Sequence, residues 1–374
     1  MTTQRFTGAA LFDGTTLHPS AILRVVDGVV TDPVGPGQDI ALDGGILTPG
    51  FLDLQVNGGG GRMVDGQTDA AMLAALCDTH ARLGATGILP TLITDTPDAT
   101  AAVIAAGITA AQQNTPGFLG LHLEGPHLDP RRKGAHDPAL IRPMTEADLT
   151  RLLDAAQRLP SLMVTLAPEA ATPDQIGRLR RAGVIVSLGH SDANFGSAQA
   201  AMGAGATCVT HLFNAMSQLG NRDPGLVGAA LGKPVFAGLI ADGLHVAPAT
   251  IRIAMAAKPE GIFLVSDAMS VAGTDLAELT LGNRRILRRD GRLTLADRTL
   301  AGADLTLPQA VQVMVTQVGI PLAAALAMAT SRPAACLGRS GRIGHLLPGG
   351  PADMLHLGPD LALRAVWRAG ERIV

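Results

Sequence analysis

The 374 residues are enough for an α/β barrel, which takes about 250 residues, plus one appended unit. The net charge is only −3 and the two signs are interspersed, so the chain has no basic block for nucleic acid or an anionic membrane surface. No apolar run reaches the ~20 residues of a membrane span, the first residues lack a signal-peptide core, and the three cysteines are scattered, so we expect a cytoplasmic protein with reduced thiols.

Short strand-like runs, separated by Gly, Asp and Pro turns, occupy both ends of the chain. They lie at 6–12, 21–30 and 39–48, and again at 341–359 and 362–374. Chain termini often lie close together in a folded protein. We therefore predict a small β-sandwich domain formed from residues 1–48 and 338–374, and a catalytic domain formed from residues 49–337.

The middle of the chain alternates apolar runs with helical stretches such as 69–84 and 146–159. The apolar runs lie at 50–56, 86–94, 117–125, 162–169, 184–190, 207–213, 235–242 and 262–268. Runs of this length are typical of buried parallel strands. Eight such repeats predict a TIM-like (β/α)8 barrel. The chain contains neither a GxGxxG fingerprint nor a P-loop sequence, which disfavours dinucleotide and ATP chemistry.

Four of these runs end in a side chain suited to catalysis. Glu124, His190 and His211 lie at or near the end of the third, fifth and sixth runs, and Asp267 near the end of the eighth. In a barrel the carboxyl ends of all strands meet at one mouth. Glu and His ligands suit Zn²⁺ with one position left open for water. An acid beside that water could accept its proton, so the pattern indicates a metal-dependent hydrolase.

Each of these residues also has a purely structural interpretation. Glu124 could cap a helix or pair with a basic residue, and Asp267 could cap the following helix. His190 and His211 could be hydrogen-bonded core imidazoles. The convergence of three possible metal ligands at three strand ends favours the metal site, because a buried carboxylate is costly unless it is paired or metal-bound.

Nine segments carry a family pattern in a fixed order. They are PGFLDLQVNGGGG (49–61), HLEGPHL (122–128), KGAHDP (133–138), TLAPE (165–169), LGHSDA (188–193), THLFNAM (210–216), NRDPGLVGAA (221–230), ADGLHV (241–246) and VSDAMSVAG (265–273). Over almost its full length the chain resembles the N-acetylglucosamine-6-phosphate deacetylase family of the amidohydrolase superfamily. HLEGP, GHSDA and HLFNAM, in that order, are the most specific part of the resemblance.

The resemblance implies a role for each site residue. Glu124, His190 and His211 would bind the metal, and Asp267 would be the acid/base residue. His136 would contact the acyl carbonyl and help to polarise it.

The resemblance also implies how the phosphosugar is bound. Asn214 and Ala215 would contact the phosphosugar, and Arg222 and His245 would bind its 6-phosphate. One of the last two would reach in from a neighbouring subunit, which implies a homodimer. A planar Arg fork suits phosphate oxygens. On the residues alone, Arg222 could equally be a solvated loop residue and His245 a core imidazole.

Gln55-Val56-Asn57 stands where many amidohydrolases carry a His-x-His pair for a second metal. An amide oxygen is a poor ligand for a transition metal compared with imidazole. The fourth run ends in Ala-Pro-Glu and offers no bridging lysine. We therefore expect one divalent metal ion per subunit, with Gln55 free to hydrogen-bond a water beside a vacant second position. Zn²⁺ is the default, and Fe²⁺, Co²⁺ or Mn²⁺ would suit the same ligands.

Together these patterns predict hydrolysis of N-acetylglucosamine 6-phosphate to glucosamine 6-phosphate and acetate, with Asp267 as general base and then general acid. Two alternatives within the same fold are N-acetylgalactosamine 6-phosphate and an N-acylamino acid as substrate. A third alternative, from a different class, is a non-catalytic protein that binds a phosphosugar.

Overall fold

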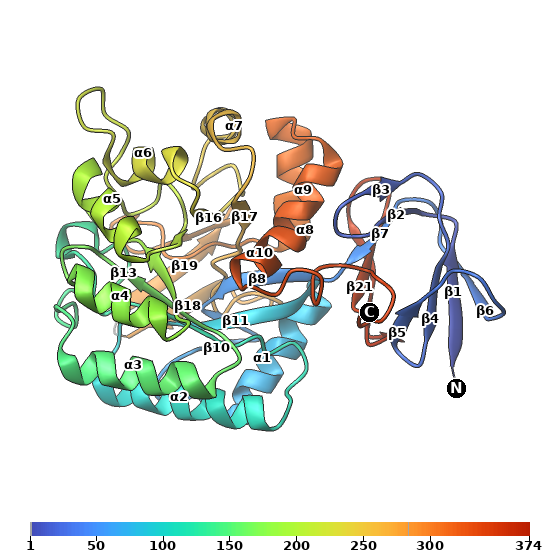
Figure 1. The fold of residues 1–374 in the computed structure, drawn as a ribbon, viewed down its shortest axis with the longest axis horizontal. Coiled ribbons are helices and arrows are strands. Elements are labelled where there is room, and N and C mark those ends of the chain that lie inside the picture. Colours follow the sequence, from blue (N-terminus) through green and yellow to red (C-terminus); the bar gives the residue numbers. More distant parts are fainter. Residues whose placement is uncertain (1, 283) are drawn as a thin grey trace.

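A computed structural model describes residues 2–282 and 284–374. Its centre is a parallel sheet with the strand order β8-β11-β12-β13-β14-β15-β16-β17 (Figure 1). The strand bounds are Phe51–Val56 (β8), Ala85–Ile93 (β11), Leu121–Glu124 (β12), Leu162–Leu166 (β13), Ile185–Leu188 (β14), Cys208–Val209 (β15), Phe236–Leu239 (β16) and Ile262–Leu264 (β17). A parallel bridge between Val56 and Ala268 joins the two ends of the sheet. The predicted barrel is confirmed, and each strand overlaps its predicted run.

Helices follow the barrel strands along the chain and cover the outside of the barrel (Figure 1). Their bounds are Ala70–Arg82 (α1), Pro97–Gln112 (α2), Glu146–Arg158 (α3), Pro173–Arg181 (α4), Phe195–Ala204 (α5), Gly225–Gly232 (α6), Pro248–Ala257 (α7), Leu307–Val313 (α8), Leu322–Ala329 (α9) and Ser331–Cys336 (α10), with a short π-helix at Met314–Val318 (η2). The start of α3 is fixed by a capping box between Thr145 and Asp148. Within the described residues no helix is both long and apolar enough to cross a membrane.

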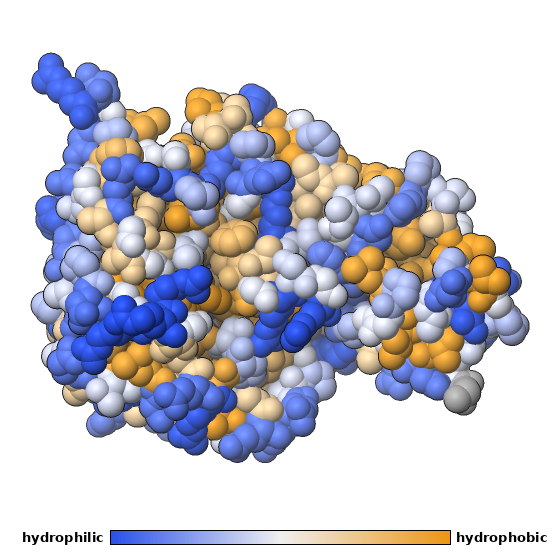
Figure 2. All heavy atoms as spheres, viewed as in Figure 1, coloured by the Kyte–Doolittle hydropathy of each residue, from blue (hydrophilic) through white to orange (hydrophobic). Residues whose placement is uncertain are grey.

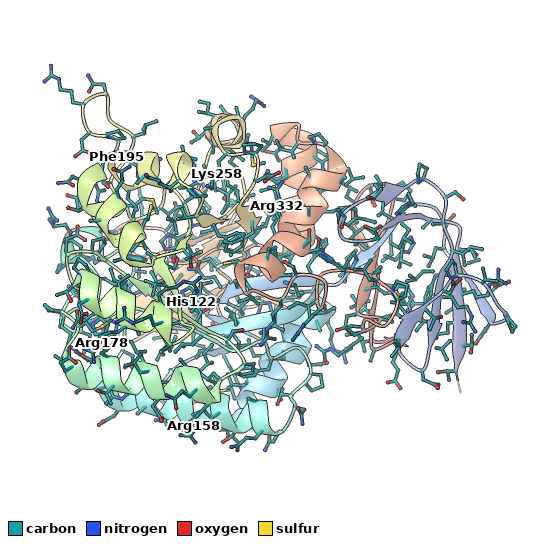
Figure 3. All side chains as sticks on the ribbon, viewed as in Figure 1. His122, Arg158, Arg178, Phe195, Lys258 and Arg332 are labelled. Atoms are coloured by element: carbon teal, nitrogen blue, oxygen red, sulfur yellow. The ribbon has the colours of Figure 1, made fainter. Side chains whose placement is uncertain are left out.

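Burial explains why the strands are apolar on both faces. Every residue of β8, β12, β13 and β14 is buried. Side chains that point outward pack under the helices, and those that point inward fill the barrel. Figure 3 shows this division, with His122 inside the barrel and Arg158 and Arg178 on the outer helices.

The two ends of the chain form a small two-sheet domain beside the barrel (Figure 1). One sheet has the order β5-β4-β1-β6, and the other has the order β23-β22-β21-β7-β2-β3. The strands are Thr3–Thr7 (β1), Ala10–Phe12 (β2), Leu17–His18 (β3), Leu23–Val26 (β4), Val29–Thr31 (β5), Gln38–Ala41 (β6), Ile46–Pro49 (β7), Met354–Leu357 (β21), Leu363–Arg368 (β22) and Glu371–Arg372 (β23).

Side chains from both termini make the core of this domain. Phe6 packs edge-to-face on Trp367 with ring centroids 5.2 Å apart, and β7 pairs antiparallel with β21. The predicted β-sandwich built from both ends is therefore confirmed as a fold, and its limits at residues 48 and 338 stay a prediction. Figure 2 shows apolar side chains exposed on this domain among polar ones.

A three-stranded antiparallel sheet follows β17 and was not predicted. Its strands are Glu278–Leu281 (β18), Arg284–Arg289 (β19) and Arg292–Thr294 (β20). Asp290-Gly291 joins β19 to β20, and Asp-Gly is a strong signal for a two-residue hairpin turn. The strand β19 is rich in arginine and buries little besides Ile286, so it lacks the apolar pattern from which a strand is predicted.

Candidate active site

The four predicted catalytic residues lie at the carboxyl ends of the barrel strands. Glu124 is the last residue of β12, whereas His190, His211 and Asp267 come just after β14, β15 and β17. These last three residues adopt positive φ angles of 48°, 27° and 52°. Such angles are uncommon for residues other than glycine and are often found at functional sites.

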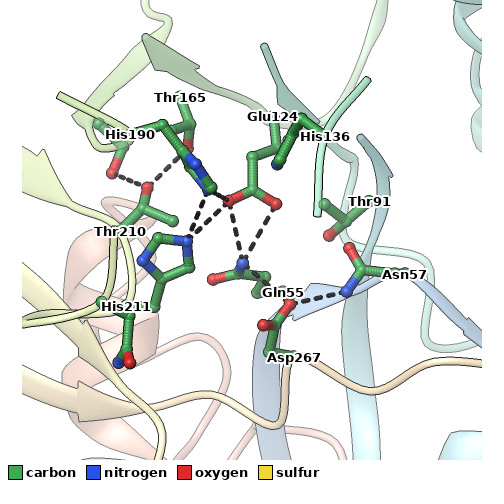
Figure 4. Close-up of polar contacts among 12 residues, drawn as sticks. Gln55, Asn57, Thr91, Glu124, His136, Thr165, His190, Thr210, His211 and Asp267 are labelled. Carbon is green, nitrogen blue, oxygen red and sulfur yellow. Dashed lines mark hydrogen bonds and ion pairs between the residues drawn. The ribbon is translucent and has the colours of Figure 1, made fainter. Parts of the chain in front are cut away.

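Glu124, His190 and His211 form one buried cluster (Figure 4). Glu124 Oε1 lies 3.2 Å from His190 Nε2 and 3.0 Å from His211 Nε2, and the two nitrogens are 3.0 Å apart. Tetrahedral Zn²⁺ with bonds of about 2.0–2.1 Å holds its ligand atoms roughly 3.3 Å apart. The donor set and its spacing therefore fit a divalent metal ion.

The orientation of His190 is fixed by the loop after β12. Its Nδ1 lies 2.8 Å from the backbone oxygen of Arg132, which can only accept a hydrogen bond. Nδ1 therefore carries a proton, which leaves Nε2 as the ring atom that faces the cluster and would bind the metal. Arg132 also pairs with Asp192 at 2.6 Å, which ties this loop to the segment after β14.

The charges of this cluster depend on one another. Burial raises the pKa of Glu124, but hydrogen bonds and charge attraction from His190 and His211 outweigh it and hold that pKa well below its usual range. Burial lowers the pKa of His211, but the hydrogen bond and the negative charge of Glu124 outweigh it, so the pKa of this imidazole is raised. The carboxylate is therefore ionised, as a metal ligand must be.

Asp267 faces the cluster and is held by two amide side chains (Figure 4). Its Oδ1 accepts hydrogen bonds from Asn57 Nδ2 at 2.7 Å and from Gln55 Nε2 at 3.1 Å. Gln55 Nε2 also lies 3.3 Å from both carboxylate oxygens of Glu124. Burial, followed by the negative charge of Glu124, raises the pKa of Asp267 to about 6. A base with such a pKa is well placed to exchange a proton near neutral pH.

His136 lies beside the cluster, with its ring centroid 4.3 Å from that of His190. Its Nδ1 faces Thr94, at 3.3 Å from the backbone nitrogen and 2.7 Å from Oγ1. Burial, followed by the charge of His190, holds the pKa of His136 well below its usual range, so the ring is neutral.

A cavity of about 530 Å³ opens above these residues. Its walls include Asn214, Ala215, His245 and Arg298 as well as the cluster and Asp267. His245 Nδ1 lies 2.6 Å from Asp242 Oδ2. Nδ1 donates its proton in a hydrogen bond to this carboxylate, so Nε2 is the second polar atom of the ring.

Arg222 is the predicted site residue that the single chain does not bring to this cavity. It is exposed and is not among the residues that line the cavity. It belongs to the connection between β15 and α6, part of which stands away from the barrel in Figure 1.

Two neutral residues of the site, Asn57 and Thr94, escape prediction from sequence. Asn57 Oδ1 is buried without a partner among residues 2–282 and 284–374, and Thr94 is buried next to His136. Their positions directly after barrel strands are a weak signal, because many Asn and Thr residues end strands for structural reasons.

Beneath the cluster, hydroxyl groups connect neighbouring strands. His122 Nε2 lies 2.7 Å from Thr165 Oγ1, which lies 2.6 Å from Thr210 Oγ1. Thr210 Oγ1 is also 2.6 Å from Ser187 Oγ. Because Thr210 immediately precedes His211, this buried network anchors the backbone that carries the imidazole.

The fold and the site agree with comparisons to known proteins. The model of the amidohydrolase family matches residues 46–373. The chain is 40% identical over 334 residues to the N-acetylgalactosamine-6-phosphate deacetylase of Shewanella sp. strain ANA-3, covering 88% of this chain and 84% of that protein. It is 34% identical over 346 residues to the N-acetylglucosamine-6-phosphate deacetylase of Haemophilus influenzae, covering 90% of each.

A solved structure gives the same result. The crystal structure of N-acetylglucosamine-6-phosphate deacetylase from Pasteurella multocida matches with a TM-score of 0.95 and 33% identity, over 99% of both chains. The chain therefore belongs to the amidohydrolase family, on the branch that includes the N-acetylglucosamine-6-phosphate and N-acetylgalactosamine-6-phosphate deacetylases.

Proposed function

We propose that this protein hydrolyses N-acetylglucosamine 6-phosphate to glucosamine 6-phosphate and acetate. The observation that carries the proposal is the buried Glu124–His190–His211 cluster with Asp267 facing it at the mouth of the barrel. Relatives at 34–40% identity that are named as deacetylases of N-acetylated sugar phosphates support the substrate class.

Glu124, His190 and His211 would hold one divalent metal ion, which is Zn²⁺ by default, with Fe²⁺, Co²⁺ and Mn²⁺ as alternatives. When bound, such an ion lowers the pKa of water to about 7 and polarises a carbonyl. Gln55 supports a single ion, because its amide N–H groups already point at Glu124 and Asp267.

Asp267 would move the proton in both halves of the reaction. It first takes a proton from water as the water oxygen bonds to the acyl carbon. It then gives that proton to the nitrogen as the amide C–N bond breaks, so that the amine and acetate leave. His136 would donate a hydrogen bond to the negative oxygen that forms between these two steps.

Contacts far from the amide would position the sugar. Asn214 and Ala215 would contact the phosphosugar, and His245 would bind the 6-phosphate through its free ring edge. Arg222 would complete the phosphate site from the partner of a homodimer, because it is exposed outside the cavity of its own chain.

N-acetylgalactosamine 6-phosphate is a second candidate substrate, and the 40% identity to a deacetylase of that epimer favours it. The deciding experiment measures acetate release from both sugar phosphates and from unphosphorylated N-acetylglucosamine, after chelation and reloading with Zn²⁺. We expect metal-dependent release from a phosphorylated sugar alone, and the faster epimer identifies the substrate.

Two other results would redirect the proposal. Turnover of N-acylamino acids without any need for phosphate would indicate a different amidohydrolase. Tight binding of the phosphosugars without acetate release, with metal present, would indicate a non-catalytic binding protein.

A further inference from the structure

The hydrogen-bond partners of His136 define which of its ring nitrogens carries the proton. The backbone nitrogen of Thr94 donates toward Nδ1 at 3.3 Å. A backbone N–H can only donate, so Nδ1 is unprotonated and offers its lone pair. The Thr94 hydroxyl lies 2.7 Å from the same atom and adds a second donor. Its other contact, with the Glu124 backbone oxygen, is longer at 3.5 Å.

Gly125 leaves the space that the Thr94 hydroxyl occupies. A Cβ atom at residue 125 would lie 2.2 Å from Thr94 Oγ1, so only glycine leaves room for the hydroxyl there. Gly125 directly follows Glu124 and has a φ of +89°. The loop that carries His136 is fixed as well, because Arg284 donates to the backbone oxygen of Ala135 at 2.6 Å.

The second ring nitrogen of His136 faces the cavity. Nε2 has no hydrogen-bond partner among the residues that the structure describes, and His136 is part of the cavity wall. A neutral imidazole carries one N–H group, and here it must be on Nε2.

We propose that Thr94 is a positioning residue that locks His136 in the Nε2–H form, so that His136 serves as a hydrogen-bond donor to the acyl oxygen and not as a base. This inference rests on the proposed deacetylation. It leaves proton transfer to Asp267 alone, because the lone pair of an Nε2 that carries a hydrogen belongs to the aromatic ring, and the basic nitrogen, Nδ1, already faces Thr94.

The first test uses no substrate. The protein with Zn²⁺ bound is labelled with ¹⁵N-histidine, and the His136 signals are assigned by comparison with His136→Gln. We expect a neutral ring with the hydrogen on Nε2. A ring with the hydrogen on Nδ1, or with both nitrogens protonated, would overturn the inference whatever the substrate proves to be.

The second test separates Thr94 from a merely structural residue. Thr94→Val removes the hydroxyl but keeps the branched shape, Thr94→Ser restores the hydroxyl, and Thr109→Val removes an exposed hydroxyl from α2 as a matched control. We expect Thr94→Val to lower kcat about 10-fold, the order expected for one hydrogen bond, with KM and bound Zn²⁺ unchanged. Thr94→Ser and the control should keep kcat within roughly 2-fold.

The two tests keep the inference distinct from the proposed function. If no sugar phosphate is hydrolysed, the substrate is wrong and the NMR result still decides the state of His136. If the wild type is active and folded Thr94→Val has an unchanged kcat, the Thr94 side chain has no positioning role and the proposal fails.

Discussion

Asp267 is the base of the proposed mechanism, and its immediate neighbours suit it to that role. Burial and the Glu124 charge raise its pKa to about 6, while Asn57 and Gln55 fix the orientation of Oδ1. We expect Asp267→Asn to lower kcat by about 10²–10⁴-fold, the usual contribution of a general acid/base. The variant should retain its metal, since Asp267 is not one of the three clustered ligands.

Acetate release and metal content measured on the same sample test this prediction. Asp43→Asn, an exposed change in the small domain, is the control and should behave as wild type. Near-native turnover by Asp267→Asn with metal bound would remove Asp267 from the mechanism.

Asp53 is a buried acid of β8 that takes no part in the proposed chemistry. Burial raises its pKa to about 7, although the backbone N–H of Ser266 donates to it. Below pH of about 3.9 both folded and unfolded chains hold its proton. As the pH rises from there to 7, the unfolded chain ionises first, so this group makes the folded state progressively less stable.

We therefore expect Asp53→Asn to flatten the pH dependence of stability. The free energy of unfolding of the wild type should fall relative to that of the variant between pH 5 and 7, by up to a few kcal/mol, and the difference should level off above pH 7. Thermal unfolding across this pH range measures it. Parallel profiles for the two proteins would mean that Asp53 is ionised in the folded state throughout.

The members of the cluster were predictable because each is an ionisable residue near the end of an apolar run, where it stands out in the sequence. Glu124 or Asp267 at the end of a buried strand is visible without any structure. The contacts of Asn57 with Asp267 and of Thr94 with His136 were not predictable, because a neutral amide or hydroxyl gains its role from the atom it faces. Which nitrogen of His136 carries the proton is decided by Thr94, which lies 42 residues earlier in the chain.

At the scale of elements, the barrel repeats were predictable from length and apolarity, whereas the β18–β20 sheet was not. That sheet buries only a small cluster around Ile286 and Leu293, so its strands lack a strong apolar signal. It nevertheless reaches the site, since Leu281 of β18 contributes to the cavity wall. In the sequence, insertions of this kind are easier to predict from turn residues such as Asp290-Gly291 than from their strands.

The pairing of β7 with β21 joins the two ends of the chain, and it depends on close backbone approach at Gly45. A Cβ at Gly45 would lie 2.0 Å from the Leu357 backbone oxygen, whereas a Cβ at Gly44 would meet only Pro359 at 3.8 Å. The φ angles of the two glycines are similar, +69° and +65°. Alanine at either position therefore costs about 1–2 kcal/mol in backbone strain.

The steric clash should separate the two variants. We expect Gly45→Ala to reduce the free energy of unfolding by roughly 1–3 kcal/mol more than Gly44→Ala, the range for overpacking. Urea unfolding of the two variants measures this difference directly. Equal losses would mean that β21 moves away from Gly45 without cost.

At the scale of the whole molecule, the proposed phosphate site takes Arg222 from a second chain. Within one chain this exposed residue lies outside the cavity wall, on the connection that precedes α6. Arg222→Ala should therefore raise KM for the sugar phosphate about 10-fold or more, because a charged hydrogen bond to phosphate is worth about 1.5–3 kcal/mol. Arg158→Ala, an exposed change on α3, should leave KM unaltered.

A mixture of two defective variants decides whether Arg222 acts across the subunit boundary. In a mixed dimer of Arg222→Ala and Asp267→Asn, the first chain keeps Asp267 and receives Arg222 from the second. One of the two sites then has every group, so activity at low substrate should rise well above that of either variant alone. If Arg222 acts within its own chain, neither site is complete and mixing restores nothing. Exchange of subunits is checked by tagging one variant and recovering the other with it, so that a failure to mix is not mistaken for a result.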